Sequence, residues 1–150
     1  MSDFDDMKII STYTTKEAVA DGYLVRVAEA ESKEAGIKFP VYLTRAVWDK
    51  YVEVPAGMES EQNLSGRLWD ILWMFRIAAK STPGQLLLFK LNCRLPDKGN
   101  WEKNEKIDGD RLTRTVTLKA FITAQDFDDP SPAIFIMKPI VKVAGLVWLW

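Results

Sequence analysis

At 150 residues, with 47% apolar and 27% charged side chains, the chain has the size and composition of one globular domain. Its 20 basic and 21 acidic side chains give a net charge of −1, which argues against a dedicated nucleic-acid-binding protein. One cysteine and no histidine exclude an internal disulfide, a multi-cysteine or histidine metal site, and a histidine-dependent nucleophile. We therefore predict no metal and no cofactor, and an enzyme here would depend on carboxylates, lysine, tyrosine or arginine.

The first half of the chain predicts short elements separated by turn residues. Two helices have clear start signals, because Thr14 and Glu17 form a capping box and Thr44 is a favourable N-cap. The expected elements are, in order, a strand at Lys8–Thr14, a helix at Thr15–Asp21, an extended segment at Tyr23–Val27, a helix at Ala28–Ala35, and a helix after Thr44 with Ala46, Val47, Trp48 and Tyr51 inward.

The longest helical pattern runs from Leu64 to Lys80. Its apolar residues form two stripes at steps of three and four, one with Leu64, Leu68, Leu72, Phe75 and Ala79 and one with Trp69, Trp73 and Ile77. Two stripes predict a helix that is covered on more than one side. We therefore expect it to be the central element of the core.

After the turn residues Ser81–Gly84 the apolar pattern changes to a period of two. Three strands are predicted, at Gln85–Leu95, Arg111–Ala124 and Ala133–Met137. Consecutive strands without helices between them favour an antiparallel meander with helices packed on one face. The predicted fold is thus a single α+β domain over residues 1–139, followed by an apolar tail at residues 140–150.

Several blocks of this sequence resemble a known family. LTRAVW and GRLWDILWM are the most specific, and ISTYTTKEAVADGYLVRV, VTLKA and IFIMKP extend the match over Ile9–Pro139. The chain resembles an uncharacterised "domain of unknown function" family carried by bacterial plasmids, phages and conjugative elements. The resemblance implies a small accessory protein of a mobile element or its host, without an activity or catalytic residues.

Charges and tryptophans on the predicted helices form a first candidate site. Four charged residues, Arg45, Arg67, Asp70 and Arg76, lie among apolar residues. They form either structural ion pairs, with Arg67 bound to Asp70 one turn away, or the lining of a ligand groove. Trp69 and Trp73 lie four residues apart and read either as core or as a stacking platform or half of a cation cage.

The polar loop Pro96–Asp110 is a second candidate site. It contains Trp101 without apolar neighbours, and long loops of this kind are functional or disordered. Trp101 either anchors a partner, together with Lys98, Lys103 and Lys106, or folds back on its own domain. We expect deletion of Lys98–Lys106 to leave folding intact.

The tail Ile140–Trp150 is almost entirely apolar, with Lys142 as its only charge. It is too short and too interrupted for a membrane span, so we expect it to cover the meander of the same chain, to join a second copy as a homodimer, or to dock on a partner. The N-terminal residues MSDFDDMK have no secretory pattern, which predicts a cytoplasmic protein. Two functions stay open: a non-enzymatic accessory protein that binds a protein partner, or a small carboxylate-dependent or metal-assisted enzyme or nucleic-acid-processing factor.

Overall fold

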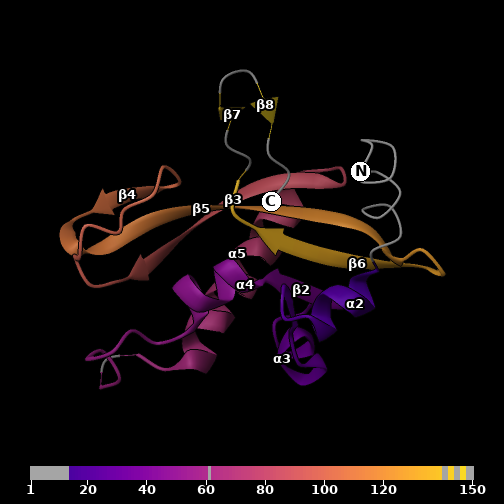
Figure 1. The fold of residues 1–150 in the computed structure, drawn as a ribbon, viewed down its shortest axis with the longest axis horizontal. Helices are drawn as coiled ribbons and strands as arrows, with labels where there is room; N and C mark the ends of the chain where they lie inside the picture. Colours follow the sequence, from indigo (N-terminus) through magenta and orange to yellow (C-terminus); the bar gives the residue numbers. More distant parts are fainter. Residues whose placement is uncertain (1–13, 61, 140–141, 144–145, 148–150) are drawn as a thin grey trace, which may run out of the picture.

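The computed structural model describes residues 14–60, 62–139, 142–143 and 146–147 (Figure 1). The strand predicted at Lys8–Thr14, apart from Thr14 itself, and the covering role of the tail therefore lie outside the described residues. The helical elements are α2 (Thr15–Ala20), α3 (Glu29–Glu34), α4 (Arg45–Val47), the π-helical turn η1 (Trp48–Val52) and α5 (Leu64–Ser81). The strands are β1 (Leu24–Arg26), β2 (Val41–Thr44), β3 (Leu86–Arg94), β4 (Glu105–Asp108), β5 (Asp110–Asp126), β6 (Asp129–Met137), β7 (Lys142–Val143) and β8 (Leu146–Val147).

The predicted α+β fold and its antiparallel meander are confirmed. The main sheet has the order β1-β2-β6-β5-β3, in which β3, β5 and β6 are antiparallel neighbours and β4 adds to β5. The pattern did not predict that β2 enters this sheet beside β6. Val41 pairs with Ile134 in parallel there, so the complete sheet is mixed. β7 and β8 pair with each other in a separate two-stranded sheet.

The helix start signals agree with the structure. The Thr14 hydroxyl accepts a hydrogen bond of 3.0 Å from the Glu17 N–H at the start of α2, and the Thr44 hydroxyl caps α4 in the same way. The expected inward face after Thr44 is wrong at Ala46, which is exposed. The helix changes to π geometry at Trp48, and this change of register leaves Tyr51 buried in the core.

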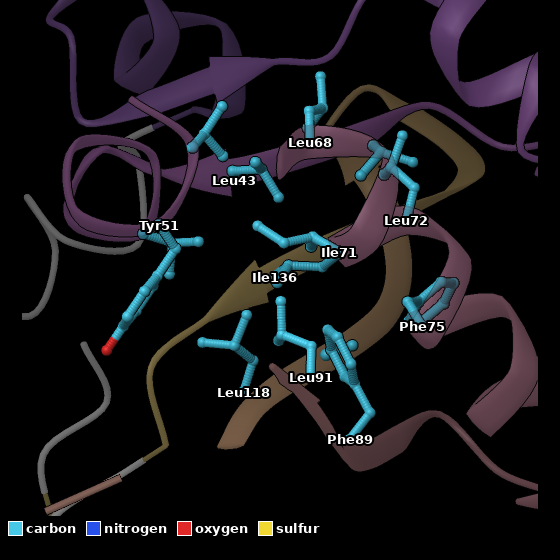
Figure 2. Packing of buried hydrophobic residues seen from close by; sticks show 14 of the residues in the cluster. Leu43, Tyr51, Leu68, Ile71, Leu72, Phe75, Phe89, Leu91, Leu118 and Ile136 are labelled. Atoms are coloured by element: carbon cyan, nitrogen blue, oxygen red, sulfur yellow. The ribbon is translucent and has the colours of Figure 1, made fainter. Parts of the chain in front are cut away.

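Helix α5 packs on one face of the sheet, as Figure 2 shows for Ile71, Leu72 and Phe75. The Phe75 ring meets Phe89 of β3 edge to face, with centroids 5.9 Å apart. The expectation that α5 is covered on a second side is only partly confirmed. Trp69 is half-buried against the core, whereas Trp73 is 38% and Ile77 44% exposed.

The opposite face of the sheet carries α2, which corrects the expectation of helices on one face alone. Ala18 of α2 packs in a second apolar cluster with Tyr42 and Phe135, whose rings stack with centroids 5.2 Å apart. The Asp126 carboxylate accepts hydrogen bonds from the N–H groups of Thr15 and Lys16, which holds the start of α2 at the end of β5. Within the described residues, no helix combines the length and apolar composition needed to cross a membrane.

Candidate binding groove

Two parts of the molecule are candidate sites. One is a groove between α3 and α5, and the other is a buried network of polar side chains around Glu105. The groove has a volume of about 270 Å³. Its lining comprises Glu31, Glu34, Ser65, Gly66, Leu68, Trp69 and Leu72. The two glutamates lie three residues apart on α3, so their carboxylates project on one side of that helix. They face an aromatic and apolar wall on α5.

Trp69 forms the aromatic part of this wall. Its ring stacks on Trp73, with centroids 5.5 Å apart and planes inclined by 13°. The guanidinium of Arg76 lies 5.3 Å from the Trp73 centroid, which extends the stack by a cation. Ser65 and Gly66 precede Trp69 by one helical turn, and their small size leaves space beside the indole.

The Arg76 side chain also lies close to the end of α3. A Cβ placed on Gly36 would lie 2.6 Å from the Arg76 Nε, and Gly36 has a φ of +81°. This backbone conformation favours glycine at the end of α3, because L side chains rarely adopt it.

The structure does not bring together the four residues predicted for a groove. Trp69 lines the α3–α5 groove, and Trp73 supports the Trp69 ring by stacking on it. Arg45 lies outside this groove, where it donates to the Gly22 carbonyl and pairs with Asp49. Asp70 lies on α5 outside the described lining, and burial raises its pKa while Arg67 opposes this shift.

The predicted pair of Arg67 with Asp70 is not formed among the described residues. The Arg67 side chain is buried and donates instead to Gln62 and to the backbone carbonyls of Lys50 and Arg94. A guanidinium has five N–H donors and fits several carbonyl oxygens at once, which explains this preference. Glu31 and Glu34 were not predicted as site residues. Their three-residue spacing, which places both carboxylates on one side of a helix, was the sequence signal that could have identified them.

The second cluster lies where η1 meets β4 and β5. The Glu105 carboxylate is fully buried and accepts hydrogen bonds from Arg114 at 2.8 Å and from the Tyr51 hydroxyl, and it forms an ion pair with Lys50 at 2.7 Å. Lys50 and Lys138 both bind Glu102, which is half-exposed beside it. The cluster thus ties the long loop to η1 and to the end of β6.

Trp101 belongs to this cluster. The Arg114 guanidinium lies 4.0 Å from the centroid of its ring, and its indole N–H donates to Asp97 at 3.1 Å. The structure thus folds Trp101 back on its own domain and leaves Lys98, Lys103 and Lys106 exposed. Because deletion of residues 98–106 would remove the buried Glu105, we no longer expect folding to survive that deletion.

The ionisation of this cluster is set by its burial and by its donors. Burial and the hydrogen bond to the Glu105 carboxylate raise the pKa of Tyr51 far above its usual range, so the phenol stays protonated. Burial alone would raise the pKa of Glu105 as well. Hydrogen bonds from Lys50, Tyr51 and Arg114 outweigh that effect and hold this pKa below 4.5. The arrangement is a neutralised structural network rather than an acid–base pair.

The lowered pKa of Glu105 predicts a loss of stability in acid. A carboxylate with a folded pKa below its unfolded value stabilises the protein fully above pH 4.5, and this contribution is lost as the pH falls through the folded pKa. The difference in unfolding free energy between the wild type and Glu105→Gln, measured in urea, should therefore shrink as the pH falls below 4.5. A constant difference in unfolding free energy over this range would contradict the assignment.

A larger hollow of about 390 Å³ lies beside α2 and is lined by Asp126, Asp128 and Asp129, of which Asp126 and Asp129 are already engaged. Asp126 caps α2, and the Asp129 carboxylate accepts hydrogen bonds from Ser131 and Gln125. Among the described residues, no group of three or more cysteine, aspartate or glutamate side chains is placed to hold a metal ion. We therefore regard the α3–α5 groove as the candidate site.

Comparison with known proteins agrees with the resemblance seen in the sequence. The model of a family described as "Family of unknown function (DUF6573)" matches residues 1–140. No curated protein and no solved structure gives a significant match. The match covers nearly all of the chain and the whole of the main sheet, α5 and the groove, and the protein therefore belongs to the DUF6573 family.

Proposed function

We propose that this protein is a non-enzymatic binding protein, and that its α3–α5 groove receives a lysine or arginine side chain of a protein partner. The setting that we propose, an accessory role for a mobile element inside a bacterial cell, rests on the resemblance of the LTRAVW and GRLWDILWM blocks. The observation that carries the binding role is the combination of two carboxylates and the Trp69 indole in the lining of one groove.

The chemistry of the groove matches a cation better than other ligands. Glu31 and Glu34 form no hydrogen bond or ion pair with other described side chains, whereas Glu29 on the same helix pairs with Lys33. A cation between these carboxylates and Trp69 would combine ion pairing with a cation–π contact. Trp73 keeps the Trp69 ring in place, so the ring is already oriented before a ligand arrives.

The enzyme alternative has less support. It required Asp70 to share a concave site with a second carboxylate, and the described lining of the groove does not include Asp70. The best-placed carboxylate elsewhere, Glu105, is enclosed by three donors and has no exposed surface on its side chain. These arrangements favour binding.

Titration with short peptides tests the proposal. The acetylated and amidated peptide Gly-Lys-Gly-Arg-Gly should shift the indole N–H signal of Trp69 in NMR spectra, whereas the same peptide with glutamates at both charged positions should not. Replacing Glu31 and Glu34 together with glutamine keeps their size and should weaken binding roughly tenfold, because two ion pairs lose their charge.

Two further variants separate groove binding from general attraction between opposite charges. Ser65→Leu fills the space beside Trp69 without changing a charge and should also abolish the shift. Glu29→Gln removes one negative charge from the same helix outside the groove and should leave the affinity unchanged. Equal losses in Glu29→Gln and in the double variant would contradict a specific site.

A further inference from the structure

Strand β3 forms one edge of the main sheet, since β5 is the only described strand that pairs with it. The Ile122 N–H donates to the Gln85 carbonyl at 2.8 Å, and the Leu95 N–H donates to the Leu112 carbonyl at 2.9 Å. Hydrogen-bonded pairs alternate in an antiparallel ladder. The odd-numbered residues of β3 are thus bonded to β5, and the even-numbered residues direct their backbone N–H and C=O groups to the open edge.

One end of this edge is closed by side chains. The outward carbonyl of Arg94 accepts hydrogen bonds from the buried Arg67 guanidinium at 2.9 Å and from Gln62 at 3.4 Å. These contacts confirm that an even-numbered carbonyl of β3 points away from β5. The remaining edge, from Leu86 to Asn92, has backbone groups that β5 does not use.

The side chains of the same even-numbered residues are also accessible. Leu86 is 52% and Leu88 60% exposed, and Lys90 follows them on the same side of the strand. The edge between Leu86 and Lys90 therefore combines unpaired backbone groups, two apolar side chains and a positive charge. A strand with apolar residues at two alternate positions and an acidic residue at the next would complement it.

Other occupants match this pattern less well. If β3 of a second copy paired antiparallel along the whole of this strand, Lys90 would lie directly opposite Lys90 of that copy. Directly opposed like charges destabilise a sheet. The tail beyond Pro139 carries Lys142 and no acidic residue, so it does not supply the charge that Lys90 requires.

We propose that the edge of β3 from Leu86 to Asn92 binds an extended segment of a partner protein by strand addition, with an acidic residue opposite Lys90 and apolar residues opposite Leu88 and Leu86. Main-chain hydrogen bonds supply affinity in this mode of recognition, and alternate side chains supply specificity. This surface is separate from the groove, so the proposal does not depend on the proposed function.

Hydrogen exchange on the full chain tests the edge. In the free protein the amides of Leu86, Leu88 and Lys90 should exchange much faster than those of Leu87 and Phe89, which are bonded to β5. The peptide Thr-Asp-Thr-Val-Thr-Val-Thr at millimolar concentration should slow the three fast amides. Protection of these amides before the peptide is added, or no protection after it, would overturn the proposal.

Three variants make the test specific. Lys90→Glu should weaken binding of this aspartate peptide roughly tenfold, because an attractive pair of charges becomes repulsive. The variant should instead bind the same peptide with lysine in place of aspartate. Leu88→Pro removes an outward N–H that β5 does not use and should abolish binding, whereas Leu88→Thr keeps that N–H and should retain it.

Three results would identify another occupant and overturn the proposal. Equal affinities of the aspartate and lysine peptides, both for the wild type and for Lys90→Glu, would show that the charge at residue 90 does not select the partner. A dimer in light scattering that Leu88→Pro dissociates would show that a second copy occupies the edge. Tighter peptide binding after truncation at Pro139 would show that the tail competes for it.

Discussion

Replacing Phe75 with alanine is expected to lower the free energy of unfolding by about 3–5 kcal/mol, the range for truncating a buried aromatic residue. Phe75 is 3% exposed and lies between α5 and β3, where its ring contacts Phe89. Truncation removes buried apolar surface and leaves a cavity that the sheet on one side and the helix on the other cannot close. Urea unfolding followed by circular dichroism measures the loss.

Ile77→Ala is the matched control for this prediction. Ile77 lies on the same helix but is 44% exposed, so its truncation should change the free energy of unfolding by less than about 0.5 kcal/mol. Similar losses in the two variants would mean that α5 is covered on two sides after all. A loss below about 0.5 kcal/mol for Phe75→Ala would remove α5 from the core.

Glu105→Gln is expected to destabilise the protein by about 3–5 kcal/mol, the range for removing one partner of a buried ion pair. The side chains of Glu105 and Arg114 are both fully buried and 2.8 Å apart. Glutamine keeps the size of the residue but leaves the Arg114 charge without its carboxylate in the interior. Denaturant unfolding at pH 7 measures this effect.

The neighbouring Glu102 provides the comparison. Its side chain is 39% exposed and binds Lys50 and Lys138 where solvent screens the charges, so Glu102→Gln should cost less than about 1 kcal/mol. Losses of equal size at Glu102 and Glu105 would contradict the view that burial makes the second pair critical.

The parts of the fold that follow from local patterns were predictable. The capping box at Thr14 starts α2, and the alternation of Leu87 and Phe89 with exposed residues marks β3. Pairings between distant segments were not predictable in this way. The sequence of β2 has no feature that selects a parallel neighbour, and Val41 pairs with Ile134 within a core that both share with α5 and the meander.

The candidate site could be predicted only in part, for the same reason. The spacing of Trp69 and Trp73 indicated a stacked pair on one helix face, which the structure contains. Glu31 and Glu34 join it only because the fold places α3 beside α5, so that both helices line one groove. The roles of Arg67 and Trp101 were likewise decided by carbonyls and charges brought together from distant strands.

The parallel pairing of β2 with β6 has a consequence for how the chain folds during synthesis. Roughly 90 residues separate Val41 from Ile134, and a ribosome needs about 5–20 s to add them. Until β6 has emerged, the β1–β2 pair has no strand to join it to the rest of the sheet, and α5 lacks part of the surface on which it packs. The nascent chain therefore exposes these apolar faces for seconds, and a chaperone that holds such segments would bind between residue 41 and residue 81.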